Sequence, residues 1–148
     1  MRFEELEVGQ SAEFTKTISD EDVMLFAKVT GDFNPVHVDE VAASSSRFGG
    51  RIAHGMLTAG LISAAIAGKL PGPGSIYLSQ TLRFTAPVRI GETVTVSVRV
   101  IEVVAGKRRV KLSTVCRNQK GEAVVEGEAL VMVSQETGGG ESTGRLAT

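Results

Sequence analysis

The segment that most restricts the fold is residues 54–68, HGMLTAGLISAAIAG, which would be apolar around almost its whole circumference as a helix. A helix of this kind is buried rather than placed on the surface. It is also too short to span a bilayer, which takes about 20 apolar residues. The prolines and glycines of LPGPGS, residues 70–75, end it. We therefore expect one helix, buried on all sides, that the rest of the chain must wrap.

After residue 75 the pattern changes to the alternation typical of strands. Runs rich in valine and threonine cover residues 76–84, 92–104, 108–118 and 122–134. Short turn signals separate the last three runs, which predicts an antiparallel meander. An open edge of such a sheet is best closed by pairing with a second copy of the chain. One helix inside a curved antiparallel sheet is an α+β arrangement.

The N-terminal half predicts a short strand over residues 10–18 and then a helix. Ser19 is the expected N-cap, acidic residues fill the first turn, and Gly31 is the expected C-cap. Beyond Gly31 we expect a helical turn and an irregular connection before the apolar helix. We expect one domain over residues 1–135. The Gly/Ser/Thr-rich residues 136–148 predict a disordered tail.

Composition excludes several classes of partner and site. The 148 residues carry a formal net charge of −1, and the pI is about 6.1, so no basic field favours nucleic acid or an anionic membrane. With two histidines and one cysteine, Cys116, we expect no metal site and no disulfide framework. The N-terminus has no signal-peptide pattern. We expect a soluble, cytoplasmic protein.

The sequence DFNPVH, residues 32–37, places Asp32 and His37 in the loop after the first expected helix. Pro35 prevents a continuous helix and pushes Asn34 to an extended conformation, so Asn34 supports a loop that can fold back on itself. A carboxylate beside an imidazole provides a base and an acid that burial can tune towards neutral pH. The same residues also suit a plain turn, with Asp32 as a cap and His37 on the surface. Local sequence alone favours this second interpretation.

The start of the apolar helix offers another chemical feature, Gly55 in the sequence His-Gly-Met. Backbone N–H groups at the positive end of a helix can stabilise a developing oxyanion, and a glycine leaves them accessible. Gly55 can equally do no more than relieve crowding. Ser63 follows two turns later, on roughly the same helix face as Met56. Its hydroxyl either bonds back to the helix or faces the site and orients a catalytic group.

As a set, these residues resemble the MaoC-like (R)-specific enoyl-CoA hydratases. The resemblance is carried by FAKVTGDFNPVHVDEVAA, FGGRIAHGMLTAGLIS and LPGPGSIYLSQTLRFTAPVRIGETV, and it extends from about residue 7 to about residue 133. It implies a hot-dog fold, in which a curved antiparallel sheet wraps a long central helix. It also implies a homodimer with the site near the interface, and no metal or redox cofactor.

The same resemblance implies that Asp32 and His37 are the catalytic dyad. Gly55 would donate its N–H to the thioester carbonyl, and Ser63 would help to hold the dyad. The implied reaction is the reversible addition of water to trans-2-enoyl-CoA, giving (R)-3-hydroxyacyl-CoA, with an acyl-CoA thioester as the partner.

Other hypotheses remain open at this point. A 3-hydroxyacyl-ACP dehydratase would run the same chemistry in reverse on a carrier-protein thioester. A non-catalytic thioester-binding module would share the fold but would not need both members of the dyad. A thioesterase would need a carboxylate on or beside the apolar helix, and residues 54–68 contain none.

Overall fold

The computed structural model describes residues 1–134, so the predicted disordered tail lies outside the described residues. The helical elements are η1 (Phe3–Glu5), α1 (Asp20–Thr30), α2 (Pro35–Val38), α3 (Glu40–Ser44), α4 (Gly55–Gly68) and η2 (Ala105–Lys107). The strands are β1 (Ser11–Thr17), β2 (Ser75–Gln80), β3 (Arg83–Phe84), β4 (Thr93–Val104), β5 (Arg109–Arg117) and β6 (Ala123–Val133). Within residues 1–134, no helix is both long enough and apolar enough to cross a membrane.

The strands form one six-stranded antiparallel sheet in the order β1-β4-β5-β6-β2, and β3 also pairs with β6. The predicted meander is present as β4, β5 and β6, joined by η2 and by the turn at residues 118–121. The alternate valines of β4 face the core and are fully buried, whereas the intervening residues are more exposed. The alternating pattern of the sequence thus sets which face of the sheet lines the core.

One predicted strand is split in two. Residues 76–84 were expected to form one strand, but the strand is interrupted between β2 and β3. The reason lies across the sheet at Gly127 of β6, where an added Cβ would be 1.8 Å from the backbone oxygen of Thr81. Thr81 also donates its amide to Glu128 O at 2.9 Å and accepts from the Glu128 amide through its hydroxyl at 3.0 Å. Glycine is therefore needed where this crossing segment sits on β6.

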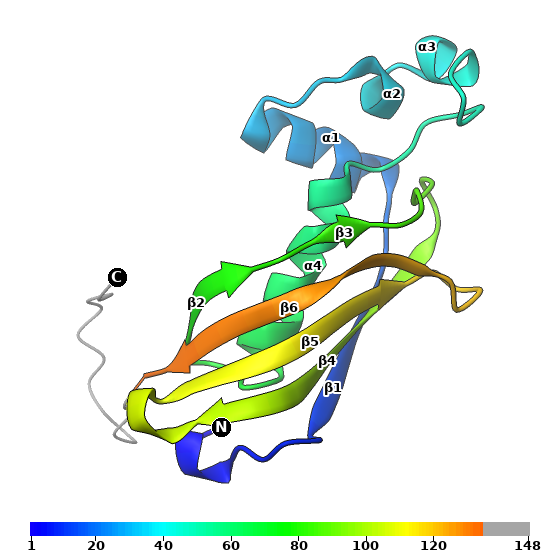
Figure 1. Ribbon diagram of the computed structural model, residues 1–148. Coiled ribbons are helices and arrows are strands. Elements are labelled where there is room, and N and C mark those ends of the chain that lie inside the picture. The colour runs from blue at the N-terminus through cyan, green and yellow to red at the C-terminus, as the bar shows by residue number, and fades with distance from the viewer. Residues whose placement is uncertain (135–148) are drawn as a thin grey trace.

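Helix α4 lies against the inner face of the curved sheet (Figure 1) and contacts β1, β4, β5 and β6. Its sheet-facing side is buried and comprises Thr58, Ala59, Leu61, Ile62, Ala65 and Ile66. Its opposite side is open, with Gly60, Ser63, Ala64 and Ala67 exposed. The prediction that this helix is buried on all sides is therefore wrong for a single chain, because the sheet curves around only one side of it.

Helices α1 to α3 gather beyond one end of the sheet, near the start of α4 (Figure 1). Helix α1 begins as predicted: the Ser19 hydroxyl accepts from the Asp22 amide, and the Asp22 carboxylate accepts from the Ser19 amide, which forms a capping box. It ends at Gly31, whose left-handed conformation at φ 86° suits glycine. The segment that follows Gly31 is thereby directed back towards α4.

Candidate active site

The loop from Asp32 to His37 is folded by its own polar side chains. Oδ1 of Asp32 accepts from the Asn34 amide at 3.2 Å, which leaves the other carboxylate oxygen free. Oδ1 of Asn34 accepts from the Val36 amide, and the backbone oxygen of Asn34 accepts from the His37 amide at 2.9 Å. Pro35 occupies the first turn of α2, where a missing N–H does no harm. Asn34 thus supports the loop geometrically, and the loop turns back as the sequence predicted.

A second segment, residues 51–54, holds this loop from behind. Nδ1 of His37 contacts the backbone oxygen of Ile52 at 2.8 Å, and the Ile52 amide donates back to Val36 O at 3.2 Å. Arg51 donates from Nε to the backbone oxygen of His37 at 2.6 Å and pairs with Asp20 of α1 at 2.7 Å. His37 is consequently 8% exposed, so it is a buried residue and not the surface histidine of the alternative interpretation.

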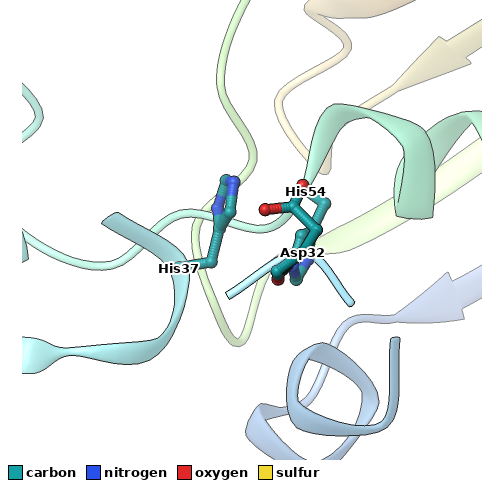
Figure 2. Close-up of side chains that lie close together, drawn as sticks. All are labelled: Asp32, His37 and His54. Atoms are coloured by element: carbon teal, nitrogen blue, oxygen red, sulfur yellow. Dashed lines mark hydrogen bonds between the residues drawn. The ribbon is translucent and has the colours of Figure 1, made fainter. Parts of the chain in front are cut away.

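His54 is the residue that sequence reasoning missed. It lies at the N-cap of α4, is 1% exposed, and contacts the backbone oxygen of Asp32 through Nε2 at 3.0 Å. Its ring lies 4.0 Å from the His37 ring, centroid to centroid, and 4.7 Å from the ring of Phe26. Figure 2 shows Asp32, His37 and His54 brought together from separate segments. The sequence offered one signal: each of the two histidines of the chain belongs to one of the two motifs, His37 to DFNPVH and His54 to His-Gly-Met.

Backbone carbonyls fix the tautomers of both imidazoles. A carbonyl oxygen can only accept, so His37 must carry its proton on Nδ1 when neutral, and Nε2 is left as a base. By the same reasoning neutral His54 carries its proton on Nε2, towards Asp32 O. Burial lowers the pKa of His54, and the nearby His37 lowers it further, although the hydrogen bond to Asp32 O opposes this. His54 is therefore a neutral imidazole at pH 7.

The start of α4 borders a cleft of about 530 Å³, which is lined by Asp32, His37, Arg47, Phe48, Ile52, Ala53, His54, Gly55, Met56, Thr58, Phe84, Thr85, Ala86, Pro87, Val88 and Val125. Counting from the start of α4, the first backbone amides that make a helical hydrogen bond are those of Leu57 and Thr58. Both donate to the backbone oxygen of His54. By helix geometry the amides of Gly55 and Met56 have no partner within the helix. The Gly55 N–H is thus available on the same cleft as the Asp32 carboxylate and the His37 imidazole.

Ser63 is not brought to this cleft within one chain. It lies on the open face of α4, in a separate hollow of about 430 Å³ that Met56, Ala59, Gly60, Tyr77, Leu78, Ser79, Gln80 and Leu82 also line. The spacing argument was right that Ser63 shares a face with Met56, which borders both hollows. It gave no information on which hollow that serine would enter.

Asp32, His37 and His54 each offer a possible ligand atom, and these atoms lie within 4.8 Å of one another. Two of the imidazole nitrogens already face backbone oxygens, Nδ1 of His37 and Nε2 of His54. Nδ1 of His54 is buried and has no hydrogen-bond partner among residues 1–134. The ring nitrogens that do not face a backbone oxygen are therefore Nε2 of His37 and Nδ1 of His54.

The chain matches the MaoC like domain over residues 3–125. It is 53% identical over 131 residues to an (R)-specific enoyl-CoA hydratase of Rhodospirillum rubrum, covering 88% of this chain and 90% of that protein. It is 52% identical over 134 residues to a 3-hydroxybutyryl-CoA dehydratase of Methylorubrum extorquens, covering 90% of this chain and 85% of that protein. An unliganded R-hydratase structure from Pseudomonas aeruginosa superposes with a TM-score of 0.87 at 53% identity, over 91% of this chain and 86% of that one. The chain belongs to the MaoC-like family and has the hot-dog fold, as its motifs predicted.

Proposed function

We propose that the protein is an (R)-specific enoyl-CoA hydratase, a hydro-lyase that adds water reversibly to trans-2-enoyl-CoA to give (R)-3-hydroxyacyl-CoA. One observation carries the proposal: the Asp32 carboxylate, the His37 imidazole and the Gly55 amide border one cleft, and within residues 1–134 neither Nε2 of His37 nor the Gly55 N–H has a hydrogen-bond partner. The hydratase name of a relative that is 53% identical over most of both chains supports the same reaction.

The amide of Gly55 is the proposed site for the thioester carbonyl. An enoyl thioester accepts a nucleophile at Cβ only when its carbonyl is polarised, because negative charge collects on that oxygen as the enolate forms. The N–H of Gly55 and the positive end of the α4 dipole can stabilise this charge. Removing one such donor in other enzymes lowers the rate by about 10²–10³.

Asp32 and His37 are the proposed acid–base pair. The free oxygen of the Asp32 carboxylate holds the water and takes up its proton as the oxygen of water bonds to Cβ. The proton then moves from the Asp32 carboxyl to Nε2 of His37, which delivers it to Cα as the enolate collapses, so that both groups return to their starting protonation states. Because both groups lie on one wall of the cleft, water adds to one face of the double bond, which accounts for a single product configuration.

The alternative on the same fold is a 3-hydroxyacyl-ACP dehydratase. The names of the two relatives reported above both specify a CoA thioester, one for hydration and one for dehydration, which favours CoA as the carrier here. The cleft lining within residues 1–134 includes one arginine, Arg47, and no lysine, so it does not present a basic patch for an acidic carrier protein. The ratio of kcat/KM for crotonyl-CoA and for the matching carrier-protein thioester separates the two functions.

We also propose that the active protein is a homodimer. Within residues 1–134, strand β2 ends the sheet with an unpaired edge, and its Tyr77 and Leu78 are exposed beside the open face of α4. An exposed edge strand next to an apolar hollow is suited to pairing with a second copy. In that assembly Ser63 lies at the interface. The help in holding a dyad that was predicted for Ser63 would then have to act across the interface between the two subunits. Light scattering during size-exclusion chromatography measures the state directly.

The test of the function is the loss of enoyl-thioester absorbance with crotonyl-CoA. Wild type should consume the substrate, whereas Asp32→Asn and His37→Gln should each lower kcat by about 10²–10⁴-fold, the usual contribution of an acid–base group. Glu102→Gln, which removes an exposed charge on β4 outside the cleft, is the matched control and should leave kcat close to wild type. Chiral analysis of the product tests the (R) configuration. Wild type that binds thioesters tightly but hydrates none of them would instead indicate the binding module.

A further inference from the structure

We infer that His54 is a positioning residue that sets the distance between the Asp32 carboxylate and the His37 imidazole. The inference rests on the proposed function, because it assigns a role within that reaction. His54 holds both partners at once: Nε2 donates to the backbone oxygen of Asp32 at 3.0 Å, and the ring lies 4.0 Å from the His37 ring. Its own N-cap position fixes it to the first turn of α4, which carries the Gly55 amide.

The requirements of the helix itself do not explain a histidine at this position. Residues that favour an N-cap have a short side-chain oxygen that accepts from the first amides of the helix. The His54 side chain makes no such capping hydrogen bond. Burial of the ring also leaves Nδ1 without a hydrogen-bond partner in the described part of the chain, which is unfavourable for an acceptor. The side-chain contacts that His54 does make are to the loop of Asp32 and His37 and to Phe26 of α1.

The surroundings of His54 restrict its ring to one placement. Phe26 of α1 packs against it at 4.7 Å, and His37 packs against it at 4.0 Å. His54 is 1% exposed, so water does not compete for its Nε2. His54 therefore connects α1, the catalytic loop and the start of α4, and it determines how they are aligned. Catalysis is sensitive to this alignment, since a displacement of about 1 Å can lower a rate by about 10²-fold.

The test separates the two contacts of His54 with three substitutions in the full-length chain. His54→Gln keeps an N–H donor near the place of Nε2 but loses the ring, His54→Phe keeps a ring but loses the donor, and His54→Ala loses both. Val98→Ala is the matched control, because it removes fully buried side-chain volume from β4, away from the cleft. Thermal midpoints, kcat and KM with crotonyl-CoA are measured for all four variants.

His54→Ala should lower kcat by about 10²-fold with KM changed less than about threefold, and His54→Gln and His54→Phe should each lower kcat by less. Val98→Ala should lower the thermal midpoint but leave kcat near wild type. A role confined to stability predicts instead that His54→Ala and Val98→Ala lose similar stability and have similar kcat. That result would overturn the inference.

A measurement without substrate distinguishes failure of this inference from failure of the proposed function. In His54→Ala, His37 is the only remaining histidine, because the chain has two. The readout is exchange of the His37 Nδ1–H proton with water, because Ile52 O keeps the proton on Nδ1 in both proteins. Ring ¹⁵N–¹H spectra should show slow exchange in wild type and faster exchange in His54→Ala, where the His37 ring loses its packing partner. If wild type hydrates no thioester, the proposed function fails, yet these spectra still decide whether His54 orients His37. An unchanged exchange rate of the His37 Nδ1–H in His54→Ala would overturn the positioning role.

Discussion

The ring of Phe84 packs directly against Gly55: a Cβ atom at position 55 would lie 2.8 Å from Cδ1 and from Cε1 of that ring. Phe84 belongs to β3, and it lines the cleft together with the first turn of α4. This close packing is a second reason why position 55 requires glycine. The first is that glycine leaves the backbone amide accessible. The sheet and the helix meet here with no space for a methyl group.

Gly55→Ala should therefore displace Phe84 or the helix start and lower kcat/KM by about 10- to 100-fold, since the amide donor would move relative to the carbonyl. Gly68→Ala, at the other end of α4, is the control, because an added Cβ there meets no atom within 4 Å. Steady-state kinetics with crotonyl-CoA measure both variants. Equal kinetics for Gly55→Ala and wild type would show that the helix start tolerates the methyl group.

Thr58 and Thr114 are both buried but differ in one hydrogen bond. The hydroxyl of Thr58 has no partner within residues 1–134, whereas that of Thr114 accepts from Nε2 of Gln80 at 2.9 Å. Thr58→Val should leave the free energy of unfolding unchanged or raise it by up to about 1 kcal/mol, because an unpaired hydroxyl is removed. Thr114→Val should lower it by about 0.5–1.5 kcal/mol, because Nε2 of Gln80 loses one of its two acceptors, the other being Thr81 O. Urea unfolding measures both, and the opposite order would contradict the assignment of hydrogen bonds.

The lowered pKa of His54 predicts a loss of stability on mild acidification. Burial is the main cause of the lowered pKa, and the ionisable groups that face the His54 ring are Asp32 and His37. Above pH 6.5, the reference pKa of an unfolded histidine, His54 is unprotonated in both the folded and the unfolded chain. Its effect on the free energy of unfolding therefore does not change with pH there. As the pH falls below that value, the unfolded chain takes up the proton before the folded chain does, so stability decreases until the pH reaches the folded pKa.

Urea midpoints measured from about pH 7.5 down to about pH 5 cover this window, which lies above the range where most carboxylates titrate. The decrease should be smaller in His54→Gln, which cannot take up this proton. Asp22, whose pKa is lowered chiefly by the Ser19 backbone N–H, affects stability only at more acidic pH, near its reference value of 3.8. Parallel profiles for wild type and His54→Gln would contradict the prediction.

Gly127→Ala should be among the most destabilising substitutions in the sheet. Its Cβ would meet the backbone oxygen of Thr81 at 1.8 Å, and a backbone oxygen cannot move aside as a flexible side chain can. The expected loss is about 3 kcal/mol or more, comparable to other cases of severe overpacking. Gly106→Ala, where an added Cβ has no neighbour within 4 Å, should change stability by less than about 1 kcal/mol. Similar thermal midpoints for the two variants would show that the Thr81 crossing can shift.

Local signals in the sequence predicted local structure well. Ser19 and Gly31 marked the ends of α1, because capping depends on residues that are neighbours in the chain. Alternating valines located β4 to β6 and their core face, because this alternation is also a pattern among residues that are close together in the chain. The break between β2 and β3 was not predictable from residues 76–84 alone, since it depends on Gly127, more than 40 positions later.

The site was predicted in part. The loop motif proposed Asp32 and His37, and Pro35 indicated a turn; the structure places both residues on one cleft, and their catalytic role stays a prediction. His54 was missed because attention at His-Gly-Met fell on the glycine, and no local pattern shows that this ring packs on His37. Ser63 was placed on the correct face of α4, but which hollow it enters depends on the curvature of the sheet. Tertiary contacts decided both cases.

The cleft has two walls of different composition. Asp32, His37 and the Gly55 amide belong to the chain before and at the start of α4, whereas Ala86, Pro87, Val88 and Val125 line the cleft from the sheet and its connections. Under the proposed function, proton transfer and accommodation of the acyl chain fall to separate stretches of sequence. Replacing a side chain on the sheet wall changes the room for the substrate without altering any ionisable group. This division makes the protein a suitable scaffold for selecting enzymes with new chain-length preferences.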